Sequence, residues 1–199
     1  SPEPFSNIGL SLLGDAVGIL VLYTTVAARD LARHSVAVYR ALERFDLAEA
    51  RRLVSWMVGR DTERLTETEV VRAAVESVAE NTVDGIIAPL FFAALGGPVG
   101  AMTYKAINTL DSMIGYKKPG LKELGYAGAR LDDLANWIPA RLSIILIALA
   151  RPSGARSAIR EAFKYHSATP SPNAGWPMAA AAGSLGIRVP IDLGLTIVV

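Results

Sequence analysis

The chain alternates between apolar runs and stretches in which apolar and charged residues recur at helical spacing. The first apolar run covers residues 10–28 and contains one charge, Asp15. Its length is close to the roughly 20 residues that cross a bilayer core as a helix. A cleaved signal peptide fits worse, because no lysine or arginine precedes the run. Residues 10–28 are therefore predicted to span a membrane.

Two later apolar segments are less regular. Residues 86–110 contain Pro89 and a Gly-Gly-Pro run at 96–98. These breakers predict a broken or re-entrant helix, whose freed backbone groups must be satisfied by protein or water. Residues 137–150 are short for a span and carry Arg141, so a buried or interfacial helix is an equal alternative.

Residues 29–72 place apolar side chains at spacings of three to seven among arginine, glutamate and aspartate, which predicts amphipathic helices. Two arginines follow the first apolar run, and the positive-inside tendency puts this region on the cytoplasmic side. Thr66 followed by Glu69 forms a capping-box pattern and predicts a helix over residues 67–83.

No run alternates like a strand over more than a few residues, and residues 175–199 are apolar with interruptions. The predicted fold class is all-α: a polytopic membrane helical bundle with amphipathic helices on the cytoplasmic side. Trp56, Trp137 and Trp176 are interpreted as interfacial anchors.

Composition supports a membrane setting. Half of the 199 residues are hydrophobic, a fifth are charged and mean hydropathy is +0.33. A net charge of +1 without a clustered basic face argues against nucleic-acid binding. With no cysteine, a metal would be held by oxygen ligands or by His34 and His166, and oxygen ligands favour Mg²⁺. His34 is interpreted as a surface or interface residue, whereas His166 precedes a Ser-Pro-Asn-Ala-Gly loop that could admit a substrate, although a plain turn is nearly as good an explanation.

Carboxylates and carboxamides stand inside the apolar, helix-patterned region, where an isolated charge is costly to bury. They are Glu76, Glu80, Asn81, Asp84, Asn108, Asp111, Asp132, Asp133 and Asn136. Glu76, Glu80 and Asp84 fall on one helix face and repel one another, so they require a nearby cation, either a metal or Arg72. An acidic, solvated helix face is the alternative.

The Asn108–Asp111 and Asp132–Asn136 pairs have helical spacing and could each converge on one ion that also binds substrate phosphate. Candidate phosphate ligands come from a Gly-Arg-Asp-Thr run and from isolated lysines: Arg60, Asp61, Lys105, Lys117 and Lys118. A surface ion pair is the ordinary alternative for Arg60 or Lys117. No Walker or Rossmann phosphate loop is present.

Six ordered motifs closely resemble one family, that of adenosylcobinamide-phosphate synthase, the CobD/CbiB family of cobalamin biosynthesis. They are G-R-D-T at 59–62, E-S-V-A-E-N-T-V-D-G at 76–85, A-P-L-F-F-A at 88–93, Y-K-A-I-N-T-L-D-S-M-I-G-Y at 104–116, A-R-L-D-D-L-A-N-W-I-P-A-R-L at 129–142 and S-P-N-A-G-W-P at 171–177. The resemblance runs through most of residues 15–186.

The resemblance implies a multi-pass enzyme of the cell membrane that uses ATP and Mg²⁺ to join adenosylcobyric acid to aminopropanol phosphate. It implies catalytic roles for Glu80, Asp84, Asp111 and Asp132. Metal ligands are expected among Glu80, Asp84, Asp111, Asp132 and Asp133. Substrate and phosphate ligands are expected among Arg60, Asp61, Asn81, Lys105, Asn108, Arg130, Asn136, Arg141, Ser171 and Asn173.

The resemblance further implies one domain over residues 1–199 that lacks parts of the family's terminal segments. Met178 stands where the family pattern has Glu, and residues 191–199 depart from that pattern.

Expected partners are the corrinoid, the amine phosphate, ATP and the lipid bilayer; homo-oligomers or association with other membrane enzymes of the pathway stay open. The alternatives are a Mg²⁺-dependent membrane prenyltransferase using an isoprenoid pyrophosphate, or a membrane scaffold without catalysis.

Overall fold

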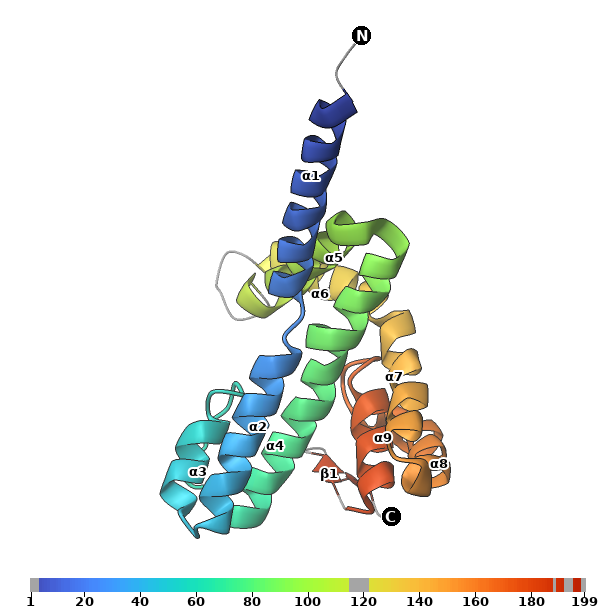
Figure 1. Ribbon diagram of the computed structural model, residues 1–199. Helices are drawn as coiled ribbons and strands as arrows, with labels where there is room; N and C mark the ends of the chain where they lie inside the picture. Colours follow the sequence, from blue (N-terminus) through green and yellow to red (C-terminus); the bar gives the residue numbers. More distant parts are fainter. Residues whose placement is uncertain (1–3, 115–121, 188, 192–194, 198–199) are drawn as a thin grey trace. The chain divides into compact units, whose positions relative to one another are not determined.

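A computed structural model describes residues 4–114, 122–187, 189–191 and 195–197 (Figure 1). The described part is almost entirely helical, which confirms the all-α prediction. Contacts divide the chain into two compact units. Unit 1 comprises Ser1–Ala27 and Ala88–Ala135, and unit 2 comprises Ala28–Ile87 and Asn136–Val199.

Unit 1 contains three α-helices among its described residues, and each matches an apolar or polar-motif segment of the sequence. They are α1 (Pro4–Thr25), α5 (Ala88–Ile114) and α6 (Lys122–Ala135). Apolar side chains on α1 are largely exposed, with Leu20 at 62% and Tyr23 at 72%. An exposed apolar helix of this length suits a lipid environment.

Helix α5 reverses direction at the predicted break, which corresponds to the re-entrant alternative. Gly97 has φ +61° and ψ −153°, a conformation open essentially to glycine. The rings of Phe92 and Tyr104 stack with centroids 5.3 Å apart, whereas 12 residues of straight helix would separate them by about 18 Å. A Cβ on Gly100 would lie 2.2 Å from the Phe92 carbonyl oxygen, so only glycine permits this approach. Segment 88–114 is therefore a helical hairpin.

Unit 2 contains the amphipathic helices and the second half of the chain. Its elements are α2 (Ala28–Glu43), α3 (Leu47–Val54), α4 (Glu67–Thr82), the π-helical turn η1 (Val83–Ile87), α7 (Trp137–Ala150), the 3₁₀ turn η2 (Pro152–Gly154), α8 (Ala155–Tyr165), the 3₁₀ turn η3 (His166–Ala168), α9 (Gly175–Leu185), β1 (Val189–Ile191) and β2 (Leu195–Ile197). The antiparallel pair β1–β2, in which Pro190 is opposite Thr196, was not predicted, because three-residue strands show no periodicity.

Helix α4 begins where the sequence predicted. Thr66 Oγ1 accepts a hydrogen bond from the Glu69 backbone N–H, and Glu69 Oε2 accepts one from the Thr66 N–H over 2.7 Å. The helix buries Val70 and Ala73 against α2 and α3, whose inward residues include Val38 and Val54. Figure 1 shows α2, α3 and α4 side by side. The amphipathic pattern over 29–72 thus packs as a three-helix layer.

Two helical stretches of the described chain are long and apolar enough to cross a membrane, Leu12–Glu43 and Glu67–Met113. A third arises if Gly125–Ala135 and Trp137–Ala150 together form one span. The protein therefore has the helices of a membrane protein.

Candidate functional site

Helices α5 and α6 bring together polar residues from two of the sequence motifs. Asn108 Nδ2 on α5 donates a 3.2 Å hydrogen bond to Asp132 Oδ1 on α6, and both side chains are partly buried. The charge of Asp133 interacts with those of Asp111 and Arg130. The two motifs therefore meet within unit 1. The sequence predicted only that each pair could bind an ion from its own helix face, and that stays a prediction.

Two cationic side chains of unit 1, Arg130 and Lys105, differ in their contacts with the described residues. Arg130 Nε donates to the Tyr126 hydroxyl over 3.0 Å, and its Cζ lies 5.1 Å from the centre of that ring. Lys105 is half-buried on α5 and makes no hydrogen bond or ion pair with the described residues. Lys105 is therefore available to bind an anion. Lys117 and Lys118, also predicted for phosphate, lie outside the described residues.

Within the described ranges, no group of three or more acidic or histidine side chains is arranged to hold a metal ion. Mg²⁺ in phosphate-handling sites typically takes one or two carboxylates and completes its shell with water and substrate oxygens. The carboxylates of unit 1 have the chemistry of such a partial site. The metal assignment stays a prediction for Glu80, Asp84, Asp111, Asp132 and Asp133.

Glu76 on α4 has the cationic neighbours that its sequence context required. Arg72 Nε lies 2.8 Å from Glu76 Oε1, and Arg60 Nη2 lies 3.0 Å from Oε2. Of the two cations that the sequence allowed for this acidic face, a metal or Arg72, the structure shows Arg72 beside Glu76. Arg60 already pairs with the Glu76 carboxylate, so the ion-pair interpretation of Arg60 is correct. A phosphate bound by Arg60 would have to share its guanidinium group with Glu76.

Asp84 lies in the π-helical turn η1, directly after α4, rather than on a continuous α-helix with Glu80. π-helical turns are rare and occur frequently at functional sites. Glu80 is exposed and Asp84 half-buried, and each has an interaction partner. Asn81 Nδ2 donates back to its own helix, to the Ser77 carbonyl oxygen over 2.8 Å. The structure thus keeps Glu80 and Asp84 as candidates, while the amide group of Asn81 has a structural partner.

The Gly-Arg-Asp-Thr run borders an open polar cavity of about 480 Å³ in unit 2. Its lining residues are Ala48, Arg51, Arg52, Ser55, Arg60, Asp61, Thr62 and Glu63. Thr62 is buried and donates to the Arg51 carbonyl oxygen, and Asp61 Oδ1 accepts from the Glu63 N–H. Arg52 donates to Glu49 and holds the pKa of that carboxyl below its usual value. The run therefore stabilises a turn as well as lining the cavity.

Arg141, near the start of α7, contacts two tryptophan rings. Its Cζ lies 4.2 Å from the ring centre of Trp137 and 5.0 Å from that of Trp176. Nη1 donates to the Trp137 carbonyl oxygen over 2.6 Å and to Asn173 Oδ1 over 3.3 Å. The predicted residues Arg141 and Asn173 are therefore in contact, although 32 positions separate them.

The Ser-Pro-Asn-Ala-Gly loop is built around Ser171, whose Oγ accepts hydrogen bonds from the backbone N–H groups of Asn173 and Ala174, each over 3.2 Å. Asn173 is 6% exposed. Asn136, at the beginning of α7, is 3% exposed, so almost none of its surface is open to a ligand in this conformation. Ser171 is the more accessible of the three predicted residues.

The interpretation of Trp176 as an interfacial anchor is wrong. Trp176 is buried, and its ring stacks on the His166 ring with centroids 3.9 Å apart. A Cβ on Gly175 would lie 2.0 Å from the His166 carbonyl oxygen, so glycine is required for the loop to return this closely. The sequence signal for this contact is the Gly175-Trp176 pair at the end of the Ser-Pro-Asn-Ala-Gly-Trp run. Trp56 and Trp137 stay exposed, as anchors require.

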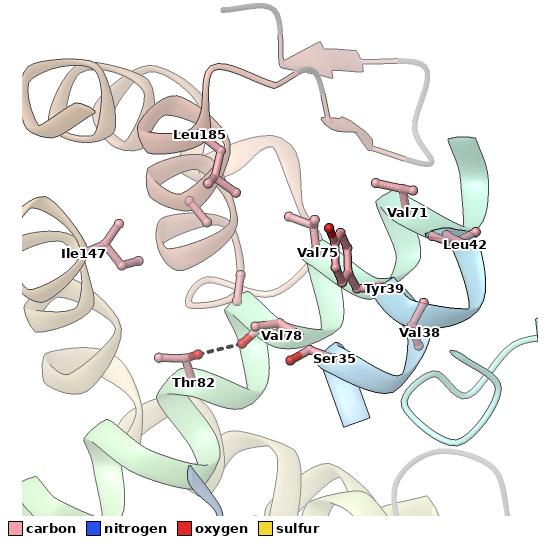
Figure 2. Close-up of a pocket in the computed structure, with 13 residues that line it drawn as sticks. Ser35, Val38, Tyr39, Leu42, Val71, Val75, Val78, Thr82, Ile147 and Leu185 are labelled. Carbon is pink, nitrogen blue, oxygen red and sulfur yellow. Dashed lines mark hydrogen bonds between the residues drawn. The ribbon is translucent and has the colours of Figure 1, made fainter. Parts of the chain in front are cut away.

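A second cavity in unit 2 has a different character (Figure 2). It has a volume of about 370 Å³ and lies among α2, α4, α7 and α9, with Val38, Val75, Ile147 and Leu185 in its lining. Figure 2 shows Thr82 donating to the Val78 carbonyl oxygen, so this hydroxyl is already used. An almost wholly apolar lining cannot solvate phosphate groups. We therefore place the polar chemistry at the sites described above.

Residues 4–190 match the profile of a family described as CobD/Cbib protein. The chain is 52% identical over 181 residues to the cobalamin biosynthesis protein CobD of Klebsiella pneumoniae, covering 89% of this chain and 56% of that protein. It is 51% identical to the cobalamin biosynthesis protein CbiB of Salmonella typhi, covering 88% and 56%. It is 50% identical to the cobalamin biosynthesis protein CobD of Pelobacter propionicus, covering 90% and 56%. The chain thus spans little more than half the length of these relatives. No solved structure is significantly similar to it.

Proposed function

The chain belongs to the CobD/Cbib family, and from that premise we propose that it acts in cobalamin biosynthesis as an adenosylcobinamide-phosphate synthase. The proposed reaction joins adenosylcobyric acid to aminopropanol phosphate through an amide bond at the expense of ATP. The proposed location is the cell membrane, which the chain crosses more than once. The observation that carries this proposal is a sequence identity of 50–52% to three proteins named for cobalamin biosynthesis.

The proposed chemistry has two steps. A carboxylate oxygen of the corrinoid attacks the γ-phosphorus of ATP, the bond to ADP breaks and an acyl phosphate forms. The amine nitrogen then attacks the acyl carbon, inorganic phosphate leaves and the ammonium proton passes to a protein carboxylate. Such a reaction requires cations around phosphate oxygens and a carboxylate close to the amine.

The groups of unit 1 suit the ATP-dependent step. Asp111, Asp132 and Asp133 would hold Mg²⁺, which when bound offsets the charge of the phosphate oxygens. The Asn108 amide orients the Asp132 carboxylate by its 3.2 Å hydrogen bond. Lys105, on the same helix as Asn108, would supply a positive charge to a phosphoryl oxygen. Glu80 and Asp84, which belong to unit 2, are the candidate carboxylates for the amine proton.

The test is product formation by the detergent-purified chain supplied with ATP, Mg²⁺, adenosylcobyric acid and aminopropanol phosphate. Mass spectrometry of the corrinoid should show the amide product, and omission of any one component should abolish it. No product with all components present, or product without ATP, would contradict the proposal. A signal that requires an isoprenoid pyrophosphate instead would favour a prenyltransferase.

A further inference from the structure

Arg141 is a cation whose charge is not matched by any described carboxylate. The guanidinium groups of Arg52, Arg60 and Arg72 each pair with a glutamate, whereas the contacts of Arg141 within the described chain are a carbonyl oxygen, a carboxamide oxygen and two aromatic rings. A partly buried cation without a counter-charge is a ready partner for an anionic ligand.

The contacts of Arg141 leave one edge of the guanidinium group without a hydrogen-bond partner among the described residues. Both hydrogen bonds to the described chain are made by Nη1. Nε and Nη2 lie on the other side of the planar group and point in nearly parallel directions, which is the geometry that binds two oxygens of one phosphate or carboxylate group. These two nitrogens have no partner among the described residues.

The surroundings hold this edge in place before any ligand arrives. The rings of Trp137 and Trp176 both contact the guanidinium group. Trp176 is itself fixed by stacking on His166 and by an edge contact with Phe163. Asn173 anchors Nη1 from the Ser-Pro-Asn-Ala-Gly loop. Preorganisation reduces the entropy lost on binding.

From this arrangement, we propose that the Nε–Nη2 edge of Arg141 binds the phosphate monoester of the amine substrate. The identity of the ligand rests on the proposed function, whereas the oxyanion site rests on the geometry alone. A single fork suits one terminal phosphate group. A triphosphate requires several cations and metal ligands, which the carboxylate and lysine positions of unit 1 provide.

Binding can be measured without turnover through tryptophan fluorescence of the full chain in detergent. The Trp56→Phe background removes the tryptophan that does not contact Arg141. Titration with inorganic phosphate should give a saturable change, and aminopropanol phosphate should compete with it. ATP without Mg²⁺ should compete more weakly; stronger competition by ATP would overturn the assignment to the amine substrate.

Arg141→Lys keeps the charge but loses the parallel pair of donors, and it should weaken phosphate binding about tenfold or more. Arg151→Lys is the matched control, because Arg151 donates to the Ser184 carbonyl oxygen in the same unit without touching a tryptophan. Trp137→Leu, at a half-exposed position, should also weaken binding and provides a second variant if Arg141→Lys fails to fold.

An unchanged dissociation constant in Arg141→Lys, or an equal loss in Arg151→Lys, would overturn the site. So would the absence of saturable binding by any of the probes. Phosphate binding that depends on Arg141 in a protein that forms no corrinoid product would leave the oxyanion site standing and remove the proposed reaction. The two proposals therefore fail separately.

Discussion

Glu161 is a buried carboxylate with one oxygen that has no hydrogen-bond partner among the described residues. Its side chain is 3% exposed on α8. Oε1 accepts a 2.7 Å hydrogen bond from Arg160 Nε, while Oε2 is buried without a hydrogen-bond partner among the described residues. The arginine of this pair is 63% exposed and so is still largely hydrated. Burial of the carboxylate is therefore only partly compensated.

Replacing this carboxylate should cost little, whereas removing its partner should cost more. Glu161→Met fills a similar volume without a charge, and we expect the melting temperature in detergent to stay equal or rise. Arg160→Met removes the hydrogen-bond donor of this buried carboxylate and should lower stability by about 1–3 kcal/mol. Thermal unfolding of both variants checks this. A larger loss in Glu161→Met than in Arg160→Met would show that the carboxylate is required for the fold.

The negative charge of Asp132 can be removed while its hydrogen bond to Asn108 is kept. Asp132→Asn retains an oxygen that accepts from Asn108, so its structural contact can survive while the negative charge disappears. We expect product formation to fall roughly ten- to hundredfold, because the variant loses a charged interaction with the bound metal and phosphates. Asp15→Asn, at an exposed carboxylate of α1, is the control and should keep full activity. Equal rates in both variants would remove Asp132 from the site.

At the level of elements, breaks and caps could be predicted from the sequence, but the choice between a broken helix and a re-entrant one could not. The capping box at Thr66 and the breaker at 96–98 are local signals, and both are confirmed. Whether Gly97 takes a positive φ depends on what the two arms of α5 pack against, because glycine permits either sign. The π-helical turn at Val83–Ile87 likewise has no reliable local signal. The burial of Trp176 depends on a residue ten positions earlier, His166.

The hairpin of α5 makes a specific prediction about its glycines. Gly100→Ala places a methyl group 2.2 Å from the Phe92 carbonyl oxygen, and a backbone atom cannot move aside cheaply. We expect a loss of about 1–3 kcal/mol or more in the free energy of unfolding. Gly96→Ala is the matched control, because nothing lies within 4 Å of its Cβ position and its φ is −136°. Thermal unfolding in detergent compares the two. Equal melting temperatures would mean that the arms do not meet in solution.

At the scale of the molecule, each unit combines segments that lie far apart in the sequence. Unit 1 joins the first apolar helix to residues 88–135, and unit 2 joins residues 28–87 to the last third of the chain. The predicted site residues divide accordingly. Asn108, Asp111 and Asp132 belong to unit 1, whereas Arg141 and Asn173 belong to unit 2. Motif order alone could not predict this division, because it follows from tertiary contacts rather than from spacing.

This division predicts that ATP-dependent turnover at the unit 1 site requires Mg²⁺, whereas phosphate binding at Arg141 in unit 2 does not. The unit 1 site contains three carboxylates, Asp111, Asp132 and Asp133, which need a metal cation before phosphate oxygens can approach them. Chelation of Mg²⁺ by EDTA should therefore abolish ATP-dependent product formation. The Arg141 edge has no described carboxylate neighbour, so binding of inorganic phosphate there should be unchanged within error under the same conditions. Excess Mg²⁺ should restore turnover without altering the fluorescence titration. Loss of phosphate binding on chelation would instead show that Arg141 acts with a metal-bound phosphate, and the assignment of separate roles to the two sets of residues would fail.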